Sequence, residues 1–137
     1  MKQEDKELLL KDLCARLPYG VKVEYKNEIF DVEHVSPMYE EVKLDTYETW
    51  TIDVSDIKPY LFPLSRLNSL TDEQKKTLKV LCDWNDEEAD AQSILVLYQK
   101  HFVMKSDVID WLHKNHFDYR GLIPKGLALD ATGLNIY

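Results

Sequence analysis

The chain has 137 residues, of which 45% are hydrophobic, and it carries a formal net charge of −8. This length and apolar content fit one globular domain and argue against a disordered chain. The negative charge argues against direct binding to nucleic acid, which needs a basic face, and against an anionic membrane surface. The charged start of the chain is unlike a signal peptide, and uncharged runs such as residues 91–99 are too short to span a bilayer. We therefore expect a cytoplasmic protein.

A helix is predicted over residues 4–17. Its apolar residues recur at helical spacing and form one face: Leu9, Leu10, Leu13, Cys14 and Leu17. Pro18 and Gly20 end the helix. Cys14 on this face and Cys82 on a later helix are expected to be buried thiols, not a disulfide or a metal-binding pair.

A β region is predicted over residues 21–57. Apolar and polar residues alternate through residues 21–35 around a polar turn, which predicts a hairpin. Two further strands are predicted at residues 42–44 and 49–54. The second carries three apolar residues on one face: Trp50, Ile52 and Val54. Four short strands suggest a small, curved antiparallel sheet with one face covered by at least one helix.

Residues 58–70 contain two prolines among many apolar residues. This content predicts a connection packed on the body of the protein, since a free linker would be more polar. The pattern Thr71-Asp-Glu-Gln74 is a capping box that begins a helix running to about Trp84. Its inner face is expected to hold Leu78, Leu81 and Cys82. Residues 85–90 are expected to form an acidic loop or the start of a helix.

Residues 93–102 fit a helix, which we favour, but they also fit a buried strand. A last helix is predicted from a cap at Ser106 or Asp107 to about Asn115. Its inner face is expected to hold Val108, Ile109, Leu112 and His116. The sequence thus predicts a single α+β domain, with an N-terminal helix in residues 1–20, a small curved antiparallel sheet of about four strands in 21–57, a packed connection in 58–70, and a helical region with an extended apolar tail in 71–137.

Two histidines of the last helix, His113 and His116, are three positions apart and share one side of it. With His101 and Asp118 they could bind zinc, although no His-Glu-x-x-His or Cys-x-x-Cys pattern is present. The alternative is that His116 is a core histidine bonded to a backbone carbonyl, because it lies near the middle of the apolar arc. No cofactor is predicted, since residues 21–120 contain no glycine for a phosphate-binding loop.

The segment Asp118-Tyr-Arg-Gly121 places a guanidinium between an aromatic ring and a glycine. Arg120 could hold a phosphate or a carboxylate in bidentate geometry. Alternatively, Arg120 pairs with Asp118 or another acid, Tyr119 packs, and Gly121 forms a turn. Trp111, Tyr119 and Arg120 belong to residue types enriched at binding hot spots, and they are the candidate binding residues.

No catalytic residue is predicted. The acid-rich run 83–90 lacks the glycine and the final glutamate of an EF-hand loop. No local Ser-His-Asp or Cys-His arrangement is visible, and Cys14 is placed on a helix face expected to be buried. The sequence therefore favours a protein that is not an enzyme.

Three segments look familiar: Lys11-Asp-Leu-Cys-Ala-Arg-Leu-Pro-Tyr-Gly-Val-Lys-Val23, Ile57-Lys-Pro-Tyr-Leu-Phe-Pro-Leu-Ser-Arg-Leu67, and Ile109-Asp-Trp-Leu-His-Lys-Asn-His-Phe-Asp-Tyr-Arg-Gly-Leu-Ile-Pro-Lys-Gly-Leu-Ala-Leu129. The chain resembles a family of short uncharacterised proteins from prophages and mobile elements of Bacteroidales-type gut bacteria. The resemblance implies an intracellular accessory protein of a mobile or phage-like gene set. It implies no activity, ligand or catalytic residue.

Three hypotheses follow. The first is a non-enzymatic interaction module whose partner is another protein, because the chain shows no catalytic constellation, no cofactor loop and no basic face. The second is a nucleic-acid-linked role, either weak direct binding through residues 100–125 or acidic mimicry of DNA. The third is a metal-dependent hydrolase built on His101, His113, His116 and Asp118.

Overall fold

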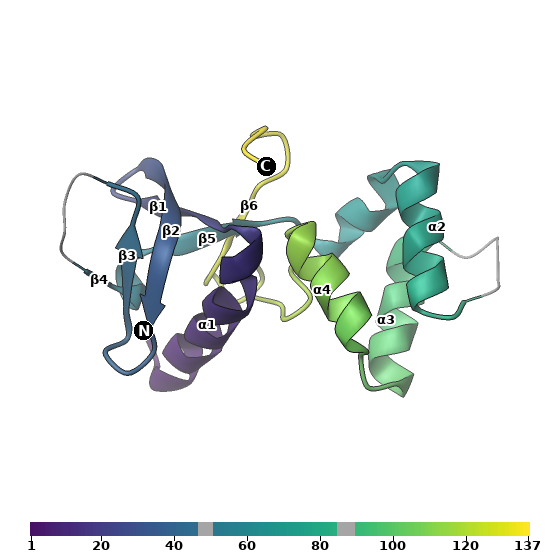
Figure 1. The fold of residues 1–137 in the computed structure, drawn as a ribbon, viewed down its shortest axis with the longest axis horizontal. Helices are drawn as coiled ribbons and strands as arrows, with labels where there is room; N and C mark the ends of the chain where they lie inside the picture. The colour runs from purple at the N-terminus through teal and green to yellow at the C-terminus, as the bar shows by residue number, and fades with distance from the viewer. Residues whose placement is uncertain (47–50, 85–89) are drawn as a thin grey trace.

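Two groups of elements meet at the middle of the molecule (Figure 1). The computed structural model describes residues 1–46, 51–84 and 90–137. The helices are α1 (Gln3–Arg16), α2 (Asp72–Leu81), α3 (Ala91–His101) and α4 (Ser106–Lys114), with short 3₁₀ helices η1 (Leu17–Tyr19), η2 (Val54–Asp56) and η3 (Leu64–Ser69). The strands are β1 (Lys22–Tyr25), β2 (Glu28–Ser36), β3 (Glu41–Leu44), β4 (Ile52–Asp53), β5 (Lys58–Leu61) and β6 (Leu129–Asp130). We call α1 with the strands the sheet lobe, and η3 with α2, α3 and α4 the helical lobe.

The strands form one open sheet in the order β4-β3-β2-β1-β5-β6. β1 to β4 make an antiparallel meander, and β5 returns to pair antiparallel with β1. β6 comes from the C-terminal tail and pairs parallel with β5. The predicted α+β class is confirmed, but the predicted number of about four strands is wrong, since the described residues form six.

The additional strand β5 lies in the segment predicted as a packed connection. Its residues Pro59, Tyr60 and Leu61 are all buried, so the alternation that marks a half-exposed strand is absent. Pro59 lies opposite Val23 of β1, whereas the ladder with β6 begins only at Tyr60. Proline is tolerated at such a position because it need not donate a hydrogen bond to a second neighbouring strand.

β2 contains a β-bulge that shifts its inward-facing residues. Val32 pairs with Leu44, but the next pair joins His34 to Lys43, so one residue of β2 has no opposite partner. As a result Val32 and Val35 are buried three positions apart, and His34 is exposed. The simple alternation predicted through residues 21–35 is therefore interrupted at the bulge.

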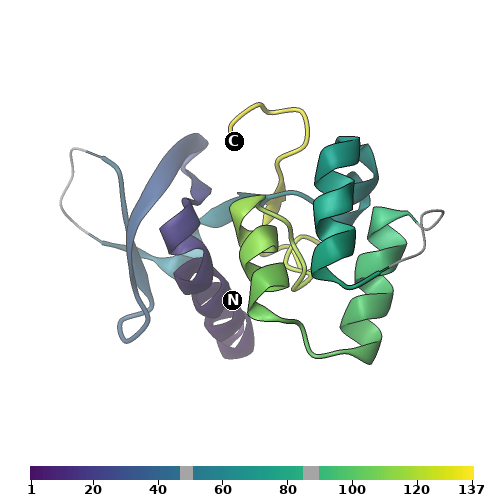
Figure 2. The ribbon, with the colours of Figure 1, turned by 45° about the vertical axis from the view of Figure 1, so that its right-hand side comes forward.

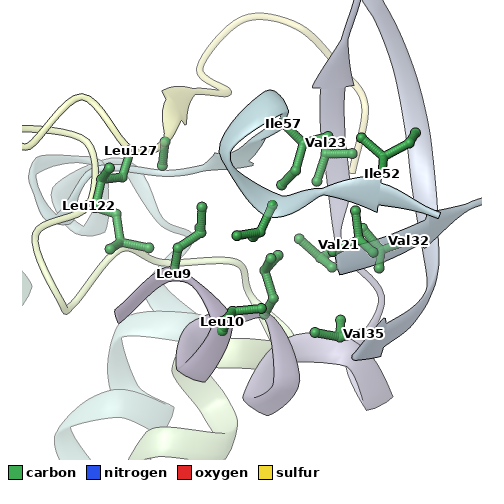
Figure 3. Close-up of a cluster of buried hydrophobic side chains, with 14 of the residues drawn as sticks. Leu9, Leu10, Val21, Val23, Val32, Val35, Ile52, Ile57, Leu122 and Leu127 are labelled. Atoms are coloured by element: carbon green, nitrogen blue, oxygen red, sulfur yellow. The ribbon is translucent and has the colours of Figure 1, made fainter. Parts of the chain in front are cut away.

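Helix α1 covers the apolar face of the sheet and contributes Leu9, Leu10 and Leu13 to its core (Figure 3). The other buried members of this core are Val21, Val23, Val32, Val35, Val42, Leu44, Ile52, Val54, Ile57 and Leu61, with Leu122, Leu127 and Ala128 from the tail. Ile52 and Val54 are buried as predicted, whereas Trp50 lies outside the described residues. The prediction for residues 85–89 also falls outside them.

The prediction that Cys14 is buried is wrong, because its side chain is exposed, while Cys82 is buried as predicted. The physical reason lies in the buried arc of α1. Asp12 and Arg16 are fully buried together with Leu9 and Leu13. The arc is therefore rotated toward these polar residues and away from Cys14.

The helical lobe has its own core, built around Leu78, Ile94, Leu95, Leu112 and Phe117. The predicted capping box of α2 is present, since Thr71 and Gln74 bond reciprocally through side chain and backbone. Residues 93–102 are helical, as favoured, except that Phe102 follows the end of α3. On α3 the side chains of Ile94, Leu95 and Tyr98 are buried, whereas Leu97 and His101 are exposed.

The predicted cap of α4 is wrong. The N-cap residue is Lys105, without a side-chain cap bond, and Ser106 and Asp107 are already in the first turn. The predicted inward position of His116 on this helix is also wrong, because α4 ends at Lys114. The backbone of His116 is left-handed, with a φ of 63°. The histidine buried on α4 is His113, which is 4% exposed.

The tail returns from the helical lobe to the sheet lobe (Figure 2). A parallel bridge joins Phe62 and Phe117, so two segments that cross between the lobes lie side by side. Farther along, the Ala131 N–H donates to the Leu61 carbonyl at 2.8 Å. The Tyr137 hydroxyl donates to the Tyr60 carbonyl at 2.8 Å. The tail thus lies on the body of the protein.

Candidate functional site

A buried ion pair lies where α1 meets α4 and the tail. Nε of Arg16 donates to Oδ2 of Asp12 at 2.8 Å, and neither side chain has any exposed surface. Nη2 of Arg16 donates to the Phe117 carbonyl at 2.6 Å. Arg16 lies on α1, and Phe117 follows α4 and packs in the core of the helical lobe. One guanidinium therefore bonds to both lobes.

A second arginine completes this charged cluster. Nε of Arg120 lies 3.1 Å from Oδ1 of Asp12, and the Arg120 side chain is only 17% exposed. The contact is an ion pair without hydrogen-bond geometry, since neither atom has a directed hydrogen-bond partner. Asp12 thus holds two guanidinium groups, Arg16 by a directed bond and Arg120 by charge attraction. We call Asp12, Arg16 and Arg120 the arginine clamp.

Aromatic and imidazole groups surround the arginine clamp. The guanidinium carbons of Arg16 and Arg120 lie 5.6 Å and 5.1 Å from the centre of the Tyr119 ring. The Tyr119 hydroxyl and Nε2 of His113 are hydrogen-bonded at 2.7 Å. Burial lowers the pKa of His113, and the charge of Arg16 lowers it further. Both effects favour the neutral imidazole, which avoids a third positive charge beside the two arginines.

Asp118 fixes the turn that presents Tyr119 and Arg120. It is 5% exposed, and its carboxylate oxygens accept hydrogen bonds from the backbone N–H groups of Leu122 and Ile123, both at 2.9 Å. Gly121 adopts a φ of 75°, which a residue with a Cβ would adopt only with strain. Arg120 pairs with an acid and Gly121 forms a turn, as the second of the two predictions for this segment stated. The acid is Asp12.

The structure places the four candidate metal ligands in different surroundings. His101 is exposed at the end of α3, and His113 is bonded to Tyr119. His116 stacks on Tyr137 with ring centres 3.5 Å apart. Both oxygens of Asp118 already accept backbone hydrogen bonds. Among residues 1–46, 51–84 and 90–137, no three His, Cys, Asp or Glu side chains are grouped to hold a metal ion.

The three candidate binding residues are partly covered. Trp111 stacks on Phe117 within the helical lobe, with ring centres 5.8 Å apart and an interplanar angle of 6°. Tyr119 and Arg120 are half-buried in the contacts described above. The binding role of these three side chains stays a prediction, while Arg120 contacts Asp12 of α1 across the lobe junction.

The most exposed apolar side chains of the sheet lobe are in the turn between β2 and β3. Met38 is 83% exposed and Tyr39 69% exposed. Beside them is a shallow pocket of about 260 Å³, lined by Glu7, Leu10, Lys11 and Cys14 of α1 and by Pro37 of the turn. We call these five residues, with Met38 and Tyr39, the turn–helix surface. Gln3 of α1 donates to Glu40 at 3.1 Å, which ties the turn to the helix.

The acidic charge of the sequence is concentrated in the segment that contains this turn. Residues 24–56 hold ten acidic and two basic residues, a net −8 that equals the charge of the whole chain. Within this segment Asp31 and Glu33 pair with lysines, but Glu28, Asp45 and Asp56 are exposed without a lysine or arginine partner among the described residues. Glu28 lies opposite Tyr25 at the end of β2 away from the turn, so these carboxylates are spread over the sheet lobe. A charge count over a short window of the sequence identifies this segment.

Comparisons with protein-family models, with curated proteins and with solved structures find no match. Within the described parts of the chain, no helix combines the length and apolar character needed to cross a membrane.

The arginine clamp predicts a large effect for Asp12→Asn. The substitution leaves the fully buried Arg16 without its counter-charge, so the free energy of unfolding should fall by about 3–5 kcal/mol. Urea denaturation measures this change. The matched control is Asp31→Asn, in an exposed pair with Lys22 at 2.9 Å, where about 1 kcal/mol or less is expected. A loss below about 1 kcal/mol for Asp12→Asn would show that the clamp does not hold the fold.

The stacked pair of His116 and Tyr137 predicts a pH dependence of stability. Burial, followed by the charges of Arg16 and Lys22, lowers the pKa of His116 to about 4. The unfolded chain therefore binds more protons than the folded chain below the ordinary histidine pKa of about 6.5. Stability contributed by neutral His116, up to about 3 kcal/mol, should be lost as the pH falls from about 6.5 to 4.

This dependence can be isolated with His116→Asn, since asparagine tolerates the left-handed backbone at this position. Urea midpoints between pH 7 and 4 should fall less steeply for the variant than for the wild type. His34→Gln, on the exposed face of β2, is the control and should keep the wild-type slope. Equal slopes for all three proteins would contradict the assignment.

Proposed function

We propose that this chain is a non-enzymatic protein-interaction module that binds a basic partner segment at the turn–helix surface. The observation that carries the proposal is the exposure of Met38 and Tyr39 within the most acidic segment of the sequence. Exposed apolar side chains surrounded by charge are typical of protein-binding surfaces. The partner should combine Lys or Arg side chains with at least one apolar anchor.

The shape of the surface supports this partner chemistry. The pocket between α1 and the turn is lined by apolar Leu10 and Pro37 and by the charged side chains of Glu7 and Lys11. An apolar anchor could occupy it, while basic groups of the partner pair with exposed acidic side chains such as Glu7. Charge complementarity of this kind accelerates association and excludes acidic competitors.

The resemblance to accessory proteins of mobile elements is compatible with this role. We extend the proposal to a cytoplasmic accessory protein of a phage-like gene set, whose partner is another protein. The same acidic segment also favours a second candidate, mimicry of DNA in the basic groove of a nucleic-acid-binding protein. In that case the partner should release the chain when DNA is added.

The test uses paired double substitutions at two exposed apolar sites. Met38→Ser with Tyr39→Ser alters the turn–helix surface, and Phe102→Ser with Val103→Ser alters the loop before α4, where the side chains are 62% and 94% exposed. Partners captured by the wild-type chain should be basic, should bind at least tenfold more weakly to the first variant, and should bind unchanged to the second. Binding should also weaken with salt.

Retained binding by the turn variant, or loss confined to the loop variant, would refute the assigned surface. Thermal unfolding of both variants checks that the fold is intact. Competition by double-stranded DNA separates the mimic from an ordinary interaction module.

A further inference from the structure

A second pocket lies on the helical lobe. It shares no lining residue with the turn–helix surface. It encloses about 310 Å³ between η3, the start of α2 and the end of α4. Phe62, Leu70 and Phe117 supply its apolar walls, and Arg66, Ser69 and Asn115 supply polar groups. This volume is at the lower end of the range for small-ligand sites.

Arg66 is held in place at this pocket without a counter-charge. Its guanidinium carbon lies 4.4 Å from the centre of the Phe62 ring, so the ring covers one face of the group. Arg16 and Arg120 both pair with Asp12, but Arg66 has no carboxylate at ion-pair distance among the described residues. Stacking fixes the plane of the guanidinium and leaves its edge N–H groups available.

The remaining polar groups show which ligand chemistry fits. Thr71 and Gln74, also at this pocket, are bonded to each other in the capping box. Asn115 uses its amide N–H on the Trp111 carbonyl at 2.8 Å. The Ser69 hydroxyl has no side-chain hydrogen bond among the described residues, and the capping box uses only the side-chain oxygen of Gln74, so the free donors are Arg66, Ser69 and the Gln74 amide N–H groups. These donors beside apolar walls call for a ligand that accepts hydrogen bonds and carries an apolar body.

We infer that this pocket binds an organic carboxylate attached to a flat apolar group. The planar fork of Arg66 matches the two oxygens of a carboxylate, and Phe62, Leu70 and Phe117 would contact the apolar part. A doubly charged phosphate fits less well, because Asp72 and Glu73 occupy the first turn of α2. The carboxylate could belong to a small aromatic acid or to the C-terminus of a peptide. The inference does not depend on the proposed function.

Titration of the ¹⁵N-labelled full chain with phenylacetate tests the inference, with neutral phenylacetamide as the matched probe. Saturable shifts of backbone amides are expected at Ser69, Leu70 and Phe117. Phenylacetamide should bind at least tenfold more weakly. Arg66→Met keeps the stem over Phe62 but removes the fork, so it should also weaken phenylacetate binding at least tenfold. Lys58→Met, an exposed cation on β5, is the control and should bind like the wild type.

A tripeptide ending in phenylalanine, with a free or an amidated C-terminus, is titrated in parallel to distinguish the two sources of carboxylate. Binding of either acid that is lost in Arg66→Met supports the site, and the stronger acid identifies the source. The inference is overturned if phenylacetamide matches phenylacetate, if Arg66→Met binds normally, or if neither acid gives saturable shifts up to about 10 mM, well above a Kd of 1 mM. An unchanged spectrum of the free variant away from the pocket excludes misfolding.

Discussion

The bond from Arg16 to the Phe117 carbonyl is the constraint on which the rest of the structure depends. Each lobe has its own buried core, and Arg16 joins them from the last turn of α1. Burying a guanidinium is unfavourable unless it is paired and hydrogen-bonded, and Asp12 one turn earlier supplies the pair. The same carboxylate attracts Arg120, and Asp118 fixes the turn that brings Arg120 there. The charged side chains of the arginine clamp therefore hold the lobe junction together.

This use of the polar residues accounts for them without a binding or catalytic role. His113, Tyr119 and Arg120 are engaged with one another or with α1, so their arrangement is explained by the stability of the junction. Met38 and Tyr39 remain exposed on the acidic sheet lobe, and Arg66 has an oriented guanidinium without an acid among the described residues. The two sites lie on different lobes and call for partners of opposite charge.

Local patterns predicted the fold class, α1, the capping box of α2 and the helical state of α3, because each depends on neighbours a few residues apart. Contacts distant in the sequence could not be predicted. Arg16 and Phe117 are 101 positions apart, and no spacing links them. The buried charges also rotated the inward arc of α1, which exposed Cys14 against expectation. Likewise, β6 is a strand because it lies beside β5, which is itself paired with the distant β1, and the bulge in β2 displaced His34 outward.

Native-state hydrogen exchange tests most directly whether the clamp makes the two lobes one cooperative unit. We predict that the slowest-exchanging amides of β2 in the sheet lobe and of α3 in the helical lobe open with the same free energy. In Arg16→Met, the two values should fall and separate, since each core then opens by itself. Two distinct values already present in the wild-type chain, or a variant in which they remain equal and unchanged, would contradict the account.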